Sequence, residues 1–339
     1  MRLRDAQPLW QPHPGWLNTA SYGLPPTPAH DALIQAVTQW RHGSSDWQPW
    51  DANVDRSRAA FATLIGAPTA DVTVSSTVSQ IMSVIATALP EGARVLVPEE
   101  EFTSNLFPWA VAARVDTAPA DRLADALTRH HHAAAFSLVQ SATGALAPLD
   151  DLRQAAREHD TLLIADASQA CGWLPVTTHG LDAIACAAYK WLMAPRGAAF
   201  AYLSPRLRAR MTPIAANWYG AADRATGFYG PPLRLADNAR AFDLSPAWFS
   251  YVGAAPALDL LNQIGIDQIH HHNLALANRF RTGLGLPEGD SAIVAVDTPH
   301  ADRLATRGIT AAVRAGKVRA SFHLYTTTDD VDRALEALT

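Results

Sequence analysis

The stretch "ACAAYKWLMAPRGAAF" (185–200) places a single lysine, Lys190, in an alanine-rich run that carries no other charge before Arg196. The rest of the chain uses arginine instead, because only Lys190 and Lys317 of its 27 basic residues are lysines. A lysine in apolar surroundings can extend its charged end to the surface while its stem stays buried. Alternatively, its amine is desolvated enough to be neutral and can form a Schiff base with a carbonyl cofactor.

A second apolar run helps to decide between these two interpretations. "TLLIAD" (161–166) ends in Asp166, and the strand-like run "AIACAA" (183–188) lies between it and Lys190. Asp166 alone is equally typical of a helix cap or a turn. At neighbouring strand ends, however, a carboxylate and a lysine match what pyridoxal phosphate requires, since the acid keeps the pyridine nitrogen protonated and the lysine carries the aldehyde.

The pattern from about residue 55 to 205 predicts the fold class. Short apolar runs alternate with helical patterns at 79–89 and 149–159, a rhythm typical of an α/β fold with a mainly parallel sheet. The strand-like runs lie at 71–74, 94–98, 134–140, 161–166, 183–188 and 198–203.

The domain prediction follows changes in this pattern. We expect an N-terminal arm (1–50) associated with the small domain, a large domain (51–250) and a smaller α+β C-terminal domain (251–339). The helical stretch 254–284 should break at Gly265, since glycine weakens a helix.

Composition excludes several classes of function. The 339 residues carry a mild formal charge of -5 without a basic stripe, so nucleic acid is not expected as a partner. The start of the chain lacks the apolar segment of a signal peptide, and no apolar run approaches membrane-spanning length, so we expect a cytoplasmic protein. Two cysteines cannot make a disulfide framework, and we expect the runs "RHHH" (129–132) and "IHHHN" (269–273) to face solvent or helix ends rather than bind a metal.

A phosphate site is expected after the strand-like run at 71–74. There Ser75, Ser76 and Thr77 open a helix, so backbone N–H groups and hydroxyls can converge on an anion. Simple N-capping by serine and threonine explains the same residues, and both interpretations can hold together.

The stretches "DASQACGW" and "AAYKWLMAPRG" resemble the signature of fold type I pyridoxal phosphate enzymes, in particular the class V aminotransferase group. That group includes cysteine desulfurases, kynureninases, isopenicillin N epimerase-like proteins and ergothioneine-type C–S lyases. The resemblance covers nearly the whole chain. It implies a seven-stranded-type sheet in the large domain, a pyridoxal 5'-phosphate cofactor, a homodimer, and a small-molecule substrate that is an amino acid or amine.

The same resemblance assigns cofactor contacts. It implies that Lys190 forms the Schiff base, that Asp166 binds the pyridine nitrogen and that Gln169 binds the phenolic oxygen. A ring stacked on the cofactor would come from Phe102 in "EFTSN", where desulfurases have histidine. The remaining contacts, mostly with the phosphate, would be Ser76, Thr77, Tyr189, Trp218 and Ser245.

For the substrate, the resemblance implies that Arg319 in "VRASFHLY" binds the α-carboxylate, which suits its planar guanidinium. Asn18 and Tyr22 in "WLNTASYGLPP" are the other implied substrate contacts. One departure limits the reaction. Desulfurases carry a nucleophilic cysteine in the last third of the chain, and no cysteine follows Cys186 here, so persulfide formation is not expected.

These residues predict an enzyme acting on an amino acid. Lys190 would also move the Cα proton. We expect transamination first, because of Arg319, with β-elimination (a C–S lyase) close behind and epimerisation as a further alternative. A non-catalytic binding protein is disfavoured because Lys190, Asp166, Gln169 and Arg319 are all present.

Overall fold

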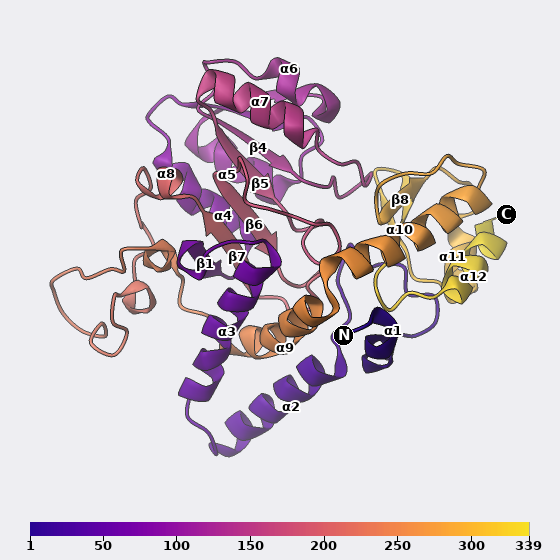
Figure 1. Cartoon of the computed structure of the whole chain (residues 1–339), viewed down its shortest axis with the longest axis horizontal. Helices are drawn as coiled ribbons and strands as arrows, with labels where there is room; N and C mark the ends of the chain where they lie inside the picture. The colour runs from indigo at the N-terminus through magenta and orange to yellow at the C-terminus, as the bar shows by residue number, and fades with distance from the viewer. Residues whose placement is uncertain (339) are drawn as a thin grey trace.

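A seven-stranded sheet forms the centre of the molecule in the computed structural model, which describes residues 1–338 (Figure 1). The strand order is β1-β7-β6-β5-β4-β2-β3. The strands are β1 (Val72–Ser75), β2 (Arg94–Pro98), β3 (Arg114–Ala118), β4 (Ala133–Ser137), β5 (Leu162–Asp166), β6 (Ala183–Ala187) and β7 (Ala199–Leu203).

The predicted, mainly parallel sheet is confirmed. Strands β3, β2, β4, β5 and β6 pair in parallel, and β7 is antiparallel to both of its neighbours, β6 and β1. The sequence prediction missed one strand, β3. This edge strand has an exposed arginine and only partly buried central residues, so it lacks the apolar run that marks the buried strands.

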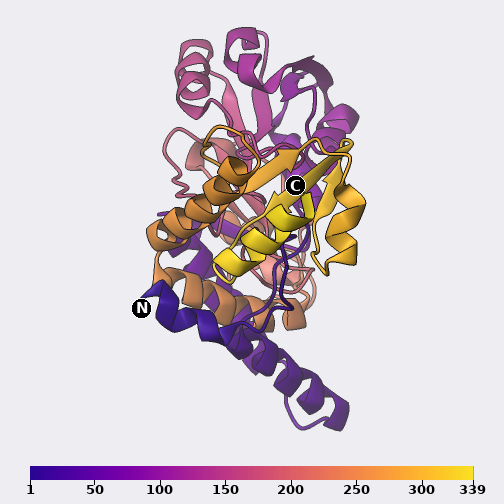
Figure 2. The ribbon, with the colours of Figure 1, turned by 90° about the vertical axis from the view of Figure 1, so that its right-hand side faces the viewer.

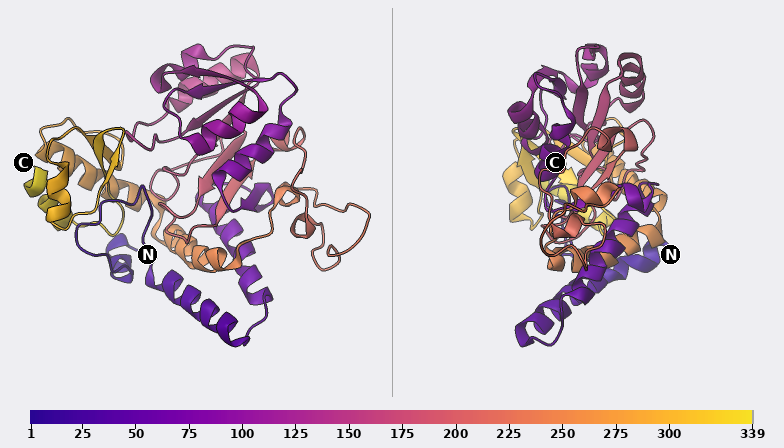
Figure 3. Two further views of the ribbon diagram at one scale, coloured as in Figure 1. Left: turned by 180° about the vertical axis from the view of Figure 1, so that it is seen from behind. Right: turned by 90° about the vertical axis from the view of Figure 1, so that its left-hand side faces the viewer.

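The two faces of the sheet bury different side chains, because successive residues of a strand point to opposite sides. One face is rich in alanine, including Ala135, Ala185 and Ala201. Short side chains let α4 (Val78–Ile85) and α5 (Thr103–Ala112) lie close to this face, and Figure 3 shows both helices in front of the sheet when it is seen from behind.

The other face carries larger residues and a thicker layer of helices. Phe200 of β7 stacks on Phe61, with ring centroids 4.9 Å apart. The covering helices are α3 (Gln48–Leu64), α7 (Leu149–His159) and α9 (Trp248–Ile264), and α2 (Thr27–His42) packs on α9. The predicted break at Gly265 is confirmed, since this residue adopts φ 86° between α9 and α10 (Ile266–Gly283).

A second, antiparallel sheet lies at the C-terminal end, in the order β8 (Ile293–Val296), β10 (Lys317–Ser321), β9 (Ala312–Arg314). Helices α10, α11 (Ala301–Thr306) and α12 (Thr328–Leu338) accompany it (Figure 2). The N-terminal segment runs along this sheet. Leu17 N–H donates a hydrogen bond to the Thr310 carbonyl, and Asn18 forms an isolated parallel β-bridge with Ser321. The domain limits at residues 50 and 250 stay a prediction.

Short helices complete the fold, and the segment between β7 and α9 is largely irregular. These helices are α1 (Leu3–Ala6), α6 (Leu123–Ala126) and α8 (Pro205–Arg208), with 3-10 turns η1 (Gln7–Leu9), η2 (Thr69–Asp71), η3 (Ala86–Ala88), η4 (Ala120–Arg122), η5 (Trp218–Gly220) and η6 (Ala239–Phe242). Over residues 1–338, every helix falls short of the length or hydropathy that crossing a membrane demands.

A buried ion pair attaches the irregular segment to the sheet. The Asp243 carboxylate accepts hydrogen bonds from the Arg58 guanidinium at 2.7 and 3.0 Å. It also accepts one from the Thr73 hydroxyl and one from the Val74 N–H, each at 2.9 Å. Helix α3, strand β1 and the end of η6 therefore depend on a single carboxylate.

Replacing Asp243 by alanine should lower the free energy of unfolding by about 3–5 kcal/mol, because the buried Arg58 would lose its two hydrogen bonds to a carboxylate and keep only the largely exposed Asp55, 3.5 Å from its Nε. The matched control is Asp125→Ala, which removes the exposed ion pair with Arg122 and should cost at most about 1 kcal/mol. Urea unfolding of both variants measures the difference. Equal losses would contradict this role for Asp243.

Candidate active site

Lys190 lies on a tight turn three residues after β6 ends. The turn closes with a hydrogen bond from Met193 N–H to the Lys190 carbonyl at 3.0 Å, and Met193 adopts φ 56°. Gly23 N–H donates to the Tyr189 carbonyl at 2.9 Å, and a Cβ on Gly23 would lie 2.0 Å from the Lys190 carbonyl oxygen. Only glycine allows this approach, so the N-terminal segment fixes the backbone that carries the lysine.

The Lys190 side chain is buried between two aromatic rings. Its Nζ lies 5.6 Å from the ring centroid of Phe102 and 5.7 Å from that of Tyr189. Phe102 precedes α5 and is half-exposed, whereas Tyr189 packs against the alanine-rich face of the sheet. The structure thus brings three of the predicted cofactor residues together.

The pKa of the Lys190 amine is lowered, chiefly by burial. The positive charges of Arg319 and Arg196 lower this pKa further, while the negative charge of Asp166 opposes them. A lysine whose ammonium form is disfavoured in this way acts more readily as a nucleophile and as a base than an ordinary surface lysine.

Asp166 is the last residue of β5 and is buried, and it pairs in register with Ala185 of β6. One carboxylate oxygen accepts a hydrogen bond from Ser168 N–H at 2.8 Å. The strands before Asp166 and Lys190 are therefore neighbours, as the sequence predicts. The contact between Asp166 and the cofactor nitrogen stays a prediction.

Gln169 lies one turn after Asp166, and the protein already uses part of its side chain. Its amide N–H donates to the Ala20 carbonyl at 2.9 Å, and its carbonyl accepts from Trp191 Nε1 at 2.7 Å. A glutamine amide has two N–H donors, so one remains for the predicted bond with the phenolic oxygen. Gln169 thus joins the N-terminal segment to the lysine turn.

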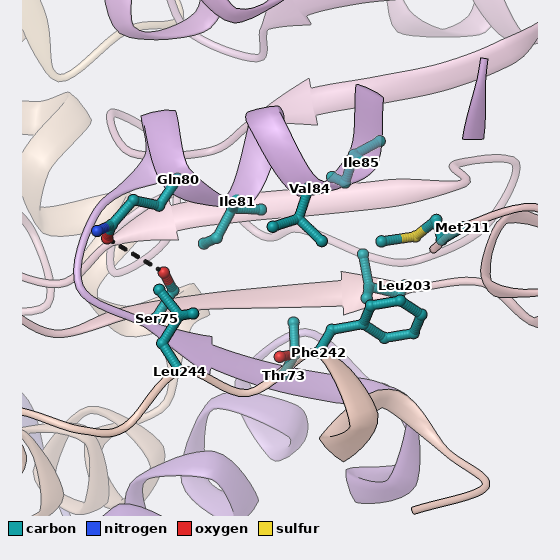
Figure 4. Close-up of a pocket in the computed structure, with 10 residues that line it drawn as sticks. All are labelled: Thr73, Ser75, Gln80, Ile81, Val84, Ile85, Leu203, Met211, Phe242 and Leu244. Carbon is teal, nitrogen blue, oxygen red and sulfur yellow. Dashed lines mark hydrogen bonds between the residues drawn. The ribbon is translucent and has the colours of Figure 1, made fainter. Parts of the chain in front are cut away.

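The predicted phosphate loop joins β1 to α4. Thr77 is the N-cap of α4, and its hydroxyl oxygen accepts from Gln80 N–H at 3.3 Å. Figure 4 shows the apolar side of α4, where the Ser75 hydroxyl bonds the Gln80 side chain at one end of a cavity that is also lined by Ile81 and Val84. That cavity of about 10 Å³ has room for one water, so it is too small for a phosphate. Phosphate binding by Ser76 and Thr77 stays a prediction.

Arg319 of β10 is 2% exposed, and its Nε is buried without a hydrogen-bond partner. The guanidinium donates to the Ser141 carbonyl at 2.7 Å and to the Ser21 hydroxyl at 2.8 Å. The Ser21 hydroxyl in turn donates to the side-chain Oδ1 of Asn18 at 2.7 Å. No carboxylate within residues 1–338 forms an ion pair with Arg319, and burial lowers its pKa to about 10. The site therefore holds a desolvated cation that lacks an anion.

Three predicted residues remain, Tyr22, Trp218 and Ser245. Tyr22 is half-exposed, packs against Trp16 with the ring planes tilted by 57° and the centroids 4.7 Å apart, and shares a cavity with Tyr189. Trp218 belongs to an aromatic cluster with Trp47, at 6.0 Å. Ser245 is exposed in the segment before α9. Roles for Trp218 and Ser245 in phosphate binding stay predictions.

Sequence reasoning missed Glu101, a buried carboxyl beside the predicted site. It accepts hydrogen bonds from Ser137 N–H at 2.7 Å, from the Ser137 hydroxyl at 2.5 Å and from Phe102 N–H at 2.9 Å. Burial raises the pKa of Glu101 to about 7, and the nearby charge of Asp166 adds to that rise. Its position three residues after the strand-like run 94–98 is equally typical of a surface loop, so the sequence gives no specific signal for it.

The expectation that the histidine runs face solvent or helix ends is partly wrong. His131 is buried, and its Nε2 contacts Asp116 at 3.2 Å. His270 stacks on Trp173 at 5.7 Å, and His272 Nε2 contacts the Thr326 carbonyl at 3.1 Å. These side chains fill gaps between elements. Over residues 1–338, no three His, Cys, Asp or Glu side chains gather as a metal ion would require.

A family model for class-V aminotransferases matches residues 41–306. The chain belongs to the class-V aminotransferase family. An uncharacterised aminotransferase of Bacillus subtilis is 24% identical over 91% of this chain and 87% of its own length. A probable cysteine desulfurase of Methanothermobacter thermautotrophicus is 22% identical over 85% of this chain and 77% of its own length.

Among solved structures, a complex of a cystine C–S lyase with its reaction product cysteine persulfide superposes with a TM-score of 0.85. The two chains are 18% identical, with 96% of this chain and 97% of that chain covered. The predicted fold type I architecture is thereby confirmed, and this class-V protein is a pyridoxal phosphate-dependent enzyme.

The residues of the site fit this cofactor. A desolvated lysine is available for its aldehyde, a buried carboxylate at the adjacent strand end suits its pyridine nitrogen, and an aromatic ring lies beside the lysine. We expect Lys190, Asp166 and Phe102 to hold it in these three ways.

The raised pKa of Glu101 predicts a pH dependence of stability. Between about pH 4.5 and 7 the folded chain keeps a proton that the unfolded chain loses, so rising pH lowers the free energy of unfolding by roughly 3 kcal/mol across this window. Glu101→Gln should remove that loss. Unfolding of both proteins at about pH 5 and pH 8 measures it, and an unchanged pH dependence in the variant would contradict the assignment.

Proposed function

We propose that this enzyme catalyses β-elimination from an S-substituted cysteine, as a C–S lyase. The observation that carries the proposal is that two buried cationic groups, the Lys190 amine and the Arg319 guanidinium, lie near enough for the charge of Arg319 to lower the pKa of Lys190. Within residues 1–338, Arg319 has no carboxylate partner. The resemblance to a probable cysteine desulfurase and to a cystine C–S lyase supports this choice of reaction.

Arg319 would bind the α-carboxylate of the substrate. Its guanidinium is held in place by Ser141 and Ser21, and a carboxylate would supply the anion that this buried cation lacks. Asn18 would act indirectly, because its side chain accepts a hydrogen bond from the Ser21 hydroxyl that Arg319 contacts. This arrangement orients the amino acid by its carboxylate end.

Lys190 would then act on the Cα proton. When bound, pyridoxal phosphate supplies a carbonyl for the substrate amine and an electron sink that makes the Cα–H bond acidic. The lowered pKa of Lys190 favours the neutral amine, which can take that proton and return a proton to the departing sulfur. The net reaction consumes water and converts the S-substituted cysteine into a thiol, pyruvate and ammonium.

The environment of the two cysteines favours β-elimination over desulfuration, which needs a reactive cysteine to accept the sulfur. Cys171 and Cys186 are both buried in the core, and burial raises the pKa of Cys186, so its reactive thiolate is suppressed. No other cysteine exists in the chain. The sulfur would therefore leave on the thiol product and would not be transferred to the protein.

Transamination is the second candidate, and the sequence placed it first. A carboxylate-binding Arg319 serves either reaction, and one relative is named as an aminotransferase. The two reactions differ in whether a 2-oxo acid acceptor is needed. Epimerisation would differ from both by leaving the substrate skeleton intact.

The test is to incubate the cofactor-loaded enzyme with S-substituted cysteines in the absence of any 2-oxo acid. We expect thiol, pyruvate and ammonia in equal amounts. Amino-group transfer that requires an added 2-oxo acid, without thiol release, would establish transamination. Racemised substrate without pyruvate would establish epimerisation.

Variants of the two cationic residues give a second prediction. Lys190→Ala should abolish turnover, and Arg319→Met should lower kcat/KM by roughly 100-fold, mainly through KM, because a charged hydrogen bond contributes about 1.5–3 kcal/mol. The matched control, Arg129→Met, removes an exposed arginine outside the site and should leave the kinetics unchanged. An unchanged KM in Arg319→Met would contradict the assigned carboxylate contact.

A further inference from the structure

We propose that a cavity beside Lys190 receives the side chain of the substrate, and that Arg196 selects side chains ending in a second anionic group. The inference rests on the proposed function for the reaction, but it concerns a different residue. It narrows the substrate class to S-substituted cysteines whose substituent carries a carboxylate.

The cavity of about 480 Å³ is formed by only two segments, the N-terminal segment 21–33 and the lysine turn 189–196. It adjoins the site at two points. Tyr189 lines it and has its ring 5.7 Å from Lys190 Nζ, and Ser21 lines it while accepting a hydrogen bond from Arg319. A substrate whose carboxylate is held by Arg319 would have its side chain directed to this cavity.

Arg196 supplies a cation to the cavity wall. Its guanidinium carbon lies 4.9 Å from the Tyr189 ring centroid, which orients the planar group by stacking. Within residues 1–338, Arg196 forms no ion pair with a carboxylate. Its charge is also one of those that lower the Lys190 pKa, so its field reaches the reacting amine.

The backbone of Arg196 is fixed, which a selective contact requires. The Ser250 hydroxyl of α9 donates to the Arg196 carbonyl at 2.8 Å. Gly197 follows with φ 110°, and a Cβ there would lie 2.7 Å from the Ser250 oxygen. The arginine therefore projects from a turn that is anchored to the large helix α9.

The chemistry of the cavity wall defines the expected ligand. Most of the wall is apolar, from Leu33, Met193 and Pro195, and no acidic residue lines it. His30 is its other basic side chain, and that ring contacts Asp31 at 2.9 Å. An apolar stem fits these walls, and a terminal anion would be attracted by Arg196. Arg319 and Arg196 would thus bind the two carboxylates of one substrate.

The experiment compares S-(2-carboxyethyl)-L-cysteine with S-propyl-L-cysteine, which are similar in size and differ in the terminal charge. In the wild-type holoenzyme we expect kcat/KM to favour the carboxylated substrate by about tenfold or more. Arg196→Met should remove this preference by raising KM for the carboxylated substrate, whereas any change in the Lys190 amine affects both substrates equally, and Arg196→Lys should restore part of the preference. An equal loss on both substrates, or no loss, would overturn the proposal.

Two further measurements distinguish a wrong role for Arg196 from a wrong reaction. Pyridoxal phosphate affinity of Arg196→Met, followed by absorbance, should equal that of the wild type, and a large loss would make Arg196 a phosphate ligand and overturn the proposal. Calorimetric binding of the two cysteine derivatives to holoenzyme Lys190→Ala reports on Arg196 without turnover. If neither substrate releases thiol, the proposed reaction fails, whereas the binding preference still tests the cavity.

Discussion

The burial of one amine is the constraint on which the rest of the site depends. An isolated buried ammonium costs several kcal/mol, so Lys190 can be tolerated in this position only if its charge is paired or lost. Asp166 at the neighbouring strand end favours the charged form, whereas burial, Arg319 and Arg196 favour the neutral form. The balance gives an amine that is held close to a carboxylate and remains reactive.

Three distant parts of the chain position this amine. Gly23 of the N-terminal segment bonds the Tyr189 carbonyl, and Trp191 bonds Gln169, which bonds Ala20. From the C-terminal part, His323 Nε2 contacts the Trp191 carbonyl at 3.0 Å. Burial lowers the pKa of His323 to about 3, so the ring is neutral and donates this bond at any physiological pH. The lysine turn is thus joined to both the N-terminal segment and the C-terminal sheet.

The same connections bring the substrate contacts to the lysine. Arg319 belongs to the small sheet, yet its guanidinium bonds Ser141 after β4 and Ser21 of the N-terminal segment. A change in the position of β10 would therefore move the carboxylate contact relative to Lys190. Because Ser21 also lines the cavity that ends at Arg196, a single segment borders both proposed anion sites.

The sequence predicts the centre of this site better than its surroundings. Asp166 and Lys190 follow strongly apolar runs, and parallel strands place their carboxyl ends together, so their proximity could be inferred. Glu101 could not, because an acidic residue after a strand is typical of any surface loop. Edge strand β3 was missed because it lacks an apolar run. The buried histidines were wrongly expected to face solvent or helix ends, because the residues that they contact come from other elements. Contacts between distant segments, such as Arg319 with Ser21, leave no local pattern.

The most direct test of the central claim uses the scarcity of lysine in this chain. The cofactor-loaded protein is reduced with sodium borohydride, digested and analysed by mass spectrometry, and among the side chains only Lys190 and Lys317 can carry the label. If Lys190 forms the Schiff base, we expect a reductively attached pyridoxyl group on Lys190, together with loss of the visible absorbance, and no label on exposed Lys317. Label on Lys317 alone, or a protein that binds no cofactor, would contradict it.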